Sequence, residues 1–343
     1  MCIALLCINE SASADELQLI LAHNRDELYN RPATCIELQA DQVTICGIDN
    51  TPAKEGGTWL ALNRSDGRFA MILNYSQDPT ELNNEPYSSS GTLENESSGG
   101  TENVNRSSGR ANQTQSVTKQ LFGTSGRGFL VRRFVNSMSA QTPLEYCKEI
   151  EQEMSRYSPF HLICIAPTAR MVESQIKADY DIGYLCSADR IGPECLGSGL
   201  YVFGNNQRNR PWLKHQHVLS RFQQTLVAHA FSDDQDHLVG DLLNLVLRDR
   251  TSCWPDSEIV QMRPLTPPDR QKALSSCFVT IPDLNYGTRS HTVILIKGNG
   301  SGVLFEWSLP VSHYDYDVVT DINKWQKTQF QFQLANCNET KRQ

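Results

Sequence analysis

Residues 1–27, MCIALLCINESASADELQLILAHNRDE, contain the pattern that decides the fold. Two apolar runs, CIALLCI at 2–8 and LQLILAH at 17–23, are separated by a polar interval. Short apolar runs bounded by turn-forming residues are typical of strands that are buried on both faces. We therefore expect a β-hairpin with a long turn, and we expect the first strand of the chain to lie in the core.

The second residue of the chain is a cysteine, which is small enough for Met1 to be removed. A mature chain that begins with Cys2 carries a thiol and a free α-amine on the same residue. The α-amine has an ordinary pKa of about 8, so it can accept the thiol proton, as it does in enzymes with an N-terminal nucleophile. The alternative is that Cys2 packs as a small hydrophobic residue.

Further apolar patterns follow along the chain. Runs at 58–63 and 68–75 flank Asp66-Gly67, a strong hairpin signal. Helical spacing occurs at 130–138 and 143–154, after Pro211 and at 238–246. The remaining expected strands are 160–166, 172–176, 183–187, 200–204, 276–281, 292–296, 303–309 and 330–334. Sequential hairpins with segregated helix pairs predict an α+β fold with antiparallel sheets, and a four-layer αββα sandwich satisfies this order.

One segment interrupts these patterns. Residues 76–126 are rich in Ser, Asn, Gly, Thr and Glu and contain few apolar residues. Such a composition cannot bury enough surface to offset the entropy of ordering. We predict a disordered insertion within a single domain of residues 1–343, because a long surface loop adds little closure entropy.

Composition excludes several functional classes. The formal net charge of -8 disfavours general binding of nucleic acid or anionic lipid. The 11 cysteines form no C-x-x-C pair, which is typical of a reducing, cytoplasmic location rather than of a disulfide framework. A basic signal region, an apolar run of about 18 residues and an H-E-x-x-H motif are all missing from the sequence. We expect no transmembrane segment, at most peripheral membrane contact, and no metal or cofactor site.

Four polar residues, Asn24-Arg25-Asp26-Glu27, directly follow the second apolar run, where packing does not explain them. A charged hairpin loop is the alternative. Together with Met1-Cys2, this pattern resembles the NRDE family, also called the transport and Golgi organization 2 family. The resemblance covers nearly the whole chain through Arg31-Pro32, Lys54-Glu55-Gly56-Gly57-Thr58-Trp59-Leu60, Asn74-Tyr75, Gly126-Arg127-Gly128, Asn205, Pro211-Trp212 and Tyr286-Gly287-Thr288-Arg289. It departs at the insertion between Asn74 and Gly126 and at Ser290-His291-Thr292.

This family is similar to N-terminal nucleophile hydrolases of the penicillin V acylase and choloylglycine hydrolase type, which are αββα sandwiches that cleave linear amides. The resemblance implies a catalytic site made of Cys2, Arg25, Asp26, Asn74, Asn205 and Arg289. In that site Arg25 favours the Cys2 thiolate, and Asp26 orients the α-ammonium.

The two asparagines and the late arginine complete the implied site. Asn74 and Asn205 donate to the oxyanion, and Arg289 pairs with Asp26 or holds an anionic substrate group. As alternatives, the asparagines form turns and Arg289 is a solvated loop charge.

Three functions remain open. The first is hydrolysis of a non-peptide C–N bond in an amide substrate by Cys2. The second is non-catalytic carriage of a small amphipathic ligand in the same pocket, with haem or an acyl derivative as cargo. The third is a scaffold in Golgi trafficking that docks through residues 76–126. The resemblance implies Golgi organization, protein secretion, and haem and lipid handling by a cytoplasmic protein associated with the Golgi or mitochondria.

Overall fold

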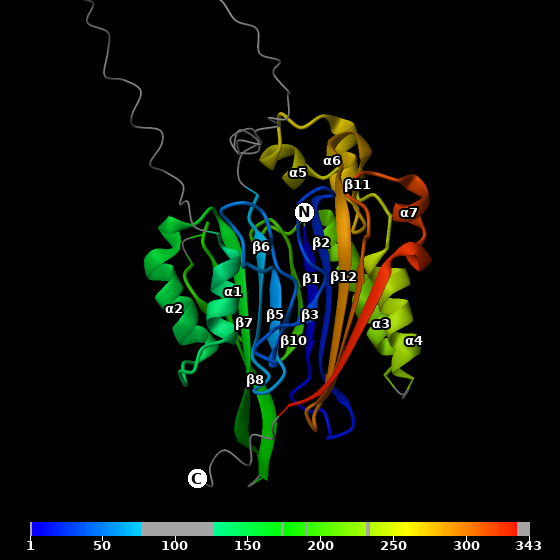
Figure 1. Cartoon of the computed structure of the whole chain (residues 1–343). Coiled ribbons are helices and arrows are strands. Elements are labelled where there is room, and N and C mark those ends of the chain that lie inside the picture. Colours follow the sequence, from blue (N-terminus) through cyan, green and yellow to red (C-terminus); the bar gives the residue numbers. More distant parts are fainter. Residues whose placement is uncertain (1, 77–125, 173–174, 190, 231–233, 335–343) are drawn as a thin grey trace, which may run out of the picture.

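Two antiparallel sheets face each other at the centre of the molecule (Figure 1). The computed structural model describes residues 2–76, 126–172, 175–189, 191–230 and 234–334. The first sheet has the order β10 (Gly199–Phe203), β1 (Ile3–Ile8), β2 (Leu17–Leu28), β12 (Tyr286–Lys297), β13 (Ser301–Ser308) and β14 (Gln326–Gln333), and β11 (Thr280–Ile281) pairs with β12. The second has the order β3 (Glu37–Leu38), β4 (Thr44–Cys46), β5 (Leu60–Asn63), β6 (Phe69–Asn74), β7 (Phe160–Val172), β8 (Gln175–Cys186) and β9 (Glu194–Leu196).

Side chains that alternate along each strand form an inner and an outer apolar layer. Leu6 and Leu21 of the first sheet share a buried cluster with Met71 and Ile163 of the second, so this cluster lies between the sheets. Leu5, the neighbour of Leu6, points to the opposite face and joins a second cluster beneath helices. Burial on both faces explains why the first hairpin reads as two continuous apolar runs.

Helices cover the outer face of each sheet (Figure 1). The bounds are α1 Gly128–Val135 and α2 Pro143–Glu153 on the second sheet, and α3 Leu213–Ala228, α4 Gln235–Asp241 and the π-helical turn η4 Leu242–Leu247 on the first. Phe134 of α1 and Ile150 of α2 share a buried cluster with Leu162 of β7. The predicted α+β class, with antiparallel sheets and helices in these four segments, is confirmed.

Short helices that were not predicted cover the end of the first sheet at which β1 begins (Figure 1). Their bounds are α5 Ser257–Met262, α6 Pro268–Leu274 and α7 Tyr316–Thr320, with 3-10 turns η5 Pro282–Leu284 and η6 Ile322–Lys324; a further 3-10 turn, η3 Met154–Arg156, directly continues α2 on the second sheet. Ile259 of α5 and Leu274 of α6 pack on Trp212, just before α3. These helices therefore tie the start of α3 to the edge of the site described below.

Three predicted strands differ from the observed ones. β2 continues to Leu28, so the polar residues 24–27 belong to the strand rather than to a loop after it. Of the strands predicted at 172–176 and 183–187, Val172 ends β7, while residues 175–176 and 183–186 belong to β8, which pairs with it. The strand predicted at 276–281 is wrong except for Thr280–Ile281. The backbone N–H of Phe278 donates to Asp249 instead of to a neighbouring strand.

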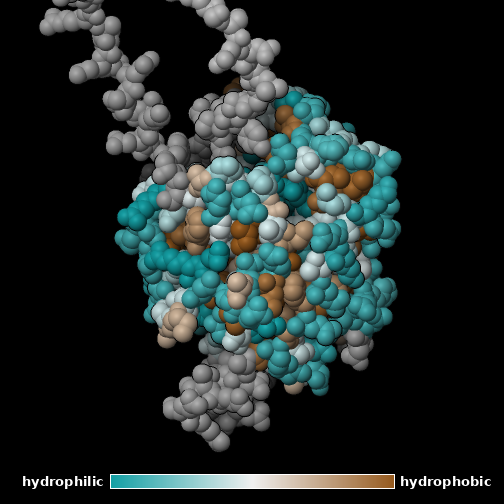
Figure 2. All heavy atoms as spheres, in the orientation of Figure 1, coloured by the Kyte–Doolittle hydropathy of each residue, from teal (hydrophilic) through white to brown (hydrophobic). Residues whose placement is uncertain are grey.

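The predicted insertion at 76–126 lies outside the described residues except at its two ends. Within the described ranges, no helix is both long enough and apolar enough to cross a bilayer. Figure 2 shows a mostly hydrophilic face with several small, separate hydrophobic patches.

Candidate active site

Cys2 lies at the start of β1 and is largely enclosed, with 9% of its surface exposed. In the ladder between β1 and β2, Ile3 is opposite Asn24. Continuing this ladder by one residue places Cys2 opposite Arg25. The Cys2 Sγ atom also lies 3.8 Å from the backbone oxygen of Asp26, to which the thiol donates. The structure therefore brings the first predicted site residue beside the next two.

Arg25 is a buried cation next to this thiol. Its side chain is 7% exposed, and its Cζ atom lies 3.9 Å from the centroid of the Trp59 ring, a cation–π contact. Trp59 belongs to the cluster between the sheets. In the described part of the chain, the Arg25 guanidinium has no hydrogen-bond or ion-pair partner. Its donors are therefore available to an anionic or carbonyl group beside Cys2.

The protonation state of the thiol follows from its surroundings. Burial raises the pKa of Cys2 above its ordinary value, while the Arg25 guanidinium acts in the opposite direction. Because burial is the larger effect, the thiol carries its proton at neutral pH. A nucleophilic Cys2 therefore needs a base that removes this proton during the reaction.

Asp26 and Asn24 share the helix-facing side of β2. Thr288 lies opposite Asp26 in the β2–β12 ladder, and its Oγ1 donates to the Asp26 Oδ1 atom at 2.7 Å. The Asn24 Nδ2 atom donates to the backbone oxygens of Leu247 at 2.8 Å and Cys277 at 3.2 Å. Asn24 therefore fastens β2 to the helical layer, and Asp26 is held by a hydroxyl that was not predicted to matter.

Asn205 lies just beyond β10, the strand on the other side of β1. The ladder between β1 and β10 ends where Ala4 is opposite Phe203, and Asn205 follows two residues later, outside the pairing. The buried Asn205 Nδ2 atom donates to the Asn74 backbone oxygen at 2.5 Å, and its Oδ1 atom finds no partner among the described residues. The Asn74 side chain is exposed. The structure thus joins Asn205 to Asn74, with the Asn205 side-chain amide bound to the Asn74 backbone carbonyl.

Arg289 lies at an irregularity in β12. The residues on either side of it pair with β2 but Arg289 does not, so it is the extra residue of a β-bulge. Its Nη1 atom donates to the backbone oxygens of Leu28 at 3.2 Å and Arg31 at 2.5 Å. Burial, reinforced by the nearby Arg25, lowers the pKa of Arg289 to about 10, so it stays a cation. The Arg289 guanidinium therefore binds backbone oxygens at the end of β2 and just after it. Thr288, the residue before Arg289, contacts Asp26.

The last residue of the polar motif supports the site from outside. Glu27 accepts a 3.0 Å ion pair from Arg31, and Arg31 also pairs with Asp49 at 2.8 Å. The Asp49 backbone N–H donates to the Gly57 oxygen at 2.8 Å. This network joins the end of β2 to the glycine-rich motif before Trp59.

The two glycine motifs also have a structural role. The Thr58 N–H donates to the Gly128 oxygen at 3.2 Å. A Cβ atom on Gly128 would lie 2.5 Å from the Thr58 nitrogen, so only glycine permits this approach. The contact fixes the segment that presents Trp59 to Arg25.

Four buried polar residues near the site were not predicted from the sequence: Thr288, Lys214, Arg263 and Glu306. The Arg263 Nη2 atom donates to the Ser76 hydroxyl at 2.7 Å. Burial raises the pKa of Glu306, and the charge of the nearby Arg25 opposes this rise. Two of these residues carry a signal of burial in the sequence. Glu306 is a charged residue within an apolar run, and Lys214 directly follows two large apolar residues.

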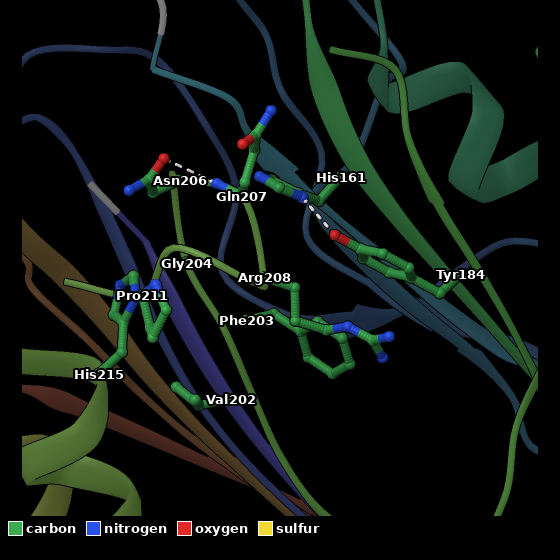
Figure 3. A pocket seen from close by; sticks show the side chains of 10 residues that line it. All are labelled: His161, Tyr184, Val202, Phe203, Gly204, Asn206, Gln207, Arg208, Pro211 and His215. Carbon is green, nitrogen blue, oxygen red and sulfur yellow. Dashed lines mark hydrogen bonds between the residues drawn. The ribbon is translucent and has the colours of Figure 1, made fainter. Parts of the chain in front are cut away.

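A small cavity borders the residues on either side of Asn205 (Figure 3). Its volume is about 10 Å³, so it holds at most one water molecule. His161 lines it with Nδ1 2.9 Å from the Tyr184 hydroxyl, and the Nε2 atoms of His161 and His215 find no partner within the described ranges. This cavity is too small for a substrate.

Metal-ligating side chains gather at one place among the described residues, away from Cys2. The ligand atoms of His229, His237 and Asp241 lie within 4.8 Å of one another. His229 and Asp241 already share a 2.8 Å contact, which an ion pair without metal explains. The prediction of no metal site stays a prediction.

Comparisons with known proteins agree with the motifs. A family model described as Transport and Golgi organisation 2 matches residues 1–310, a range that includes all six predicted site residues. The chain is 24% identical over 343 residues to Transport and Golgi organization protein 2 of Drosophila melanogaster, covering 98% of this chain and 99% of that protein. It is 28% identical over 326 residues to the Bos taurus homolog, covering 94% and 95%. The Homo sapiens homolog is 26% identical over 326 residues, with the same coverage.

Proposed function

Because the chain belongs to the transport and Golgi organisation 2 family, we propose that it is an amide hydrolase whose nucleophile is Cys2, made the first residue by removal of Met1. In this proposal it cleaves a linear, non-peptide C–N bond. It serves transport and Golgi organisation, the role in the names of its relatives, and through it protein secretion. The observation that carries the proposal is the burial of Cys2 beside Arg25 and Asp26, at the start of the strand that pairs with both β2 and β10.

The first half of the reaction forms a thioester. The Cys2 α-amine takes the thiol proton, and the sulfur attacks the carbonyl carbon of the amide. The Asn205 amide turns a donor from the Asn74 carbonyl to the new oxyanion, a contact that contributes about 3 kcal/mol in such sites. The α-ammonium then gives its proton to the leaving nitrogen as the C–N bond breaks, and the amine departs.

The second half regenerates the thiol. Water attacks the thioester carbonyl and gives a proton to the α-amine. The C–S bond then breaks, the acid leaves, and the sulfur recovers its proton. Asp26, held by Thr288, orients the α-ammonium in both halves. The buried Arg25 guanidinium stabilises the thiolate while it exists.

The arrangement of layers supports this proposal. Two antiparallel sheets with helices outside each, and a nucleophile on the first strand, are what an αββα sandwich of the N-terminal nucleophile hydrolase type requires. The raised pKa of the Cys2 thiol supports a base-assisted attack over a standing thiolate.

Covalent capture tests the proposal. The full-length chain is incubated with a thiol-directed acylating probe, and the acyl group is located by peptide mass at each cysteine. We expect preferential capture at Cys2 over the exposed Cys195, loss of this capture in Cys2→Ala, and retention in Cys195→Ala. Capture at Cys195 without capture at Cys2 would refute a nucleophilic Cys2.

A second function is favoured by one observation. A thiol whose pKa is raised by burial is a poor resting nucleophile, which suits a pocket that holds a ligand without attacking it. In this case the pocket carries haem or an acyl derivative as cargo. Titration with haem decides between the two: equal affinity in wild type and Cys2→Ala, together with no acyl capture, supports carriage. Loss of binding in Cys2→Ala contradicts it.

A further inference from the structure

Lys214 occupies a costly position in the first turn of α3. Its side chain is 0% exposed, and its Nζ atom donates to the Ser276 backbone oxygen at 3.3 Å. In the described part of the chain, no carboxylate lies within ion-pair distance of the amine. The N-terminal end of a helix is also the positive end of its dipole, which disfavours a cation. Packing alone does not favour a charged residue here, because an apolar side chain of similar volume would fill the same space.

The backbone around Lys214 holds this position firmly. Trp212, directly before α3, is fully buried, and the Lys214 amine lies 5.4 Å from its ring centroid. Asp256, which caps α5, also accepts from the Leu213 N–H at 2.6 Å. The first turn of α3 is therefore fixed by α5 on one side and by the buried indole on the other.

The amine lies on the same side of β2 as Asp26. Lys214 donates to the carbonyl of Ser276, and Asn24 donates to the carbonyl of the next residue, Cys277. The same segment continues to Val279, which accepts from the N–H of Thr288, the partner of Asp26. Lys214 and Asp26 therefore both border one short segment, and no strand separates them.

We propose that Lys214 is a positioning residue of the Cys2 site, a buried cation that counterbalances the Asp26 carboxylate and so limits the effect of that carboxylate on the Cys2 thiol. This inference rests on the proposed function, since it concerns the same nucleophile. Lys214 acts through Asp26 and through its field and does not contact the substrate.

Electrostatics support the direction of this effect. Burial lowers the pKa of Lys214, and Asp26 is the strongest charge that opposes this fall, followed by Cys277 and Cys2. Asp26 raises the pKa of the Cys2 thiol, so a cation that offsets Asp26 lowers it. The charged and titratable groups that interact with Lys214 are Asp26 from β2, Cys2 before β1, Cys277 before β11, Arg263 after α5, Cys253 before α5 and the neighbouring His215 of α3.

The test follows the alkylation of Cys2 by iodoacetamide between pH 5 and 10, read by peptide mass in the full-length chain. Lys214→Met keeps the volume and removes the charge. We expect the pH midpoint of Cys2 alkylation to rise by about one unit, which slows the reaction at pH 7.5 about tenfold. Lys214→Arg keeps the charge and is expected to restore the wild-type midpoint. Asp26→Asn removes the opposing charge and is expected to shift the midpoint downward. Lys148→Met, at an exposed position on α2, is the control.

Stability separates this role from a structural one. The proposal expects Lys214→Met to unfold at the wild-type temperature or above it, because a buried charge is replaced by an apolar side chain. A lower unfolding temperature with an unchanged alkylation midpoint would show that Lys214 only anchors Ser276, and would overturn the proposal. If Lys214→Met does not fold, an Asp26→Asn midpoint that stays at the wild-type value overturns it instead. If Cys2 of the wild type never reacts, the proposed function fails and the role of Lys214 fails with it. If Cys2 reacts equally in wild type and Lys214→Met, only the role of Lys214 fails.

Discussion

Replacing Thr288 by valine removes the hydroxyl that donates to Asp26 and leaves a side chain of nearly the same shape. This hydroxyl makes two hydrogen bonds in the folded protein. It donates to the Asp26 Oδ1 atom at 2.7 Å, and it accepts from the Val279 N–H at 3.0 Å. Both bonds are buried, so water does not replace them when the hydroxyl is lost.

The size of the effect follows from these two contacts. A hydrogen bond to a charged group contributes about 1.5–3 kcal/mol, and a buried N–H that loses its acceptor costs about 1 kcal/mol. We therefore expect Thr288→Val to lower the free energy of unfolding by about 3 kcal/mol. Thr288→Ser keeps the hydroxyl and loses only a methyl group, so we expect a loss of about 1 kcal/mol.

Chemical denaturation at pH 7.5 measures both variants against the wild type, and alkylation of Cys2 reports on the site. We expect the pH midpoint of Cys2 alkylation to shift in the valine variant and to stay unchanged in the serine variant, because only the valine variant loses the hydrogen bond to Asp26. A valine variant as stable as the serine variant would mean that the hydroxyl does not support Asp26, and the geometry of the site would have to be revised.

Three further predictions address other parts of the molecule. Arg25→Met removes a cation that lowers the pKa of Cys2, so the pH midpoint of Cys2 alkylation should rise; an unchanged midpoint contradicts this. Burial lowers the pKa of His161 to about 3, so between this value and the ordinary value of about 6.5 only the unfolded chain binds the proton. Below about pH 6.5, His161 should therefore contribute a stability loss of about 1.4 kcal/mol per pH unit, so His161→Gln should lose less stability than the wild type between pH 7 and 5 in denaturation; an equal loss contradicts this. Gly128→Ala should cost about 1–3 kcal/mol because its Cβ would meet backbone atoms, whereas Gly240→Ala, with open space around it in α4, should stabilise by about 1 kcal/mol; equal effects in denaturation would refute the close approach.

Local patterns predicted the elements whose signals are local. The hairpin of β1 and β2 and the hairpin of β5 and β6 follow from apolar runs bounded by turn residues. Four polar residues in a row rarely continue a strand, so the sequence left a charged hairpin loop open as the alternative for Asn24–Glu27. The structure resolves this because Asn24 binds the helical layer while Arg25 packs on Trp59 on the opposite side.

Tertiary contacts decided what the sequence did not reveal. The apolar run at 276–281 resembles a strand, but the backbone oxygens of Ser276 and Cys277 bind the side chains of Lys214 and Asn24, and only the end of the run pairs with β12. Arg289 was expected to pair with Asp26 or to hold an anionic substrate group; in the structure it lies at a β-bulge and donates to backbone oxygens at the end of β2 and beyond it. Neither contact is visible from spacing, since both join residues far apart in the sequence.

The predicted grouping of Cys2, Arg25 and Asp26 came from the family resemblance, and the pairing of β1 with β2 places them together. Composition and periodicity alone predicted the sheet that carries them but not their chemistry. Lys214 shows most clearly what the sequence could not reveal. Its place near Asp26 depends on the contact between α3 and Ser276, and several helices separate these two in the sequence.

The most direct test of the central claim is to measure the mass of the N-terminal peptide of the mature chain, after the chain has been purified from the cells that naturally produce it. The account predicts a peptide that starts at Cys2 with an unmodified α-amine, because that amine is the base of the proposed reaction. A peptide that retains Met1, or that carries an acetyl group, has no such base and would contradict it.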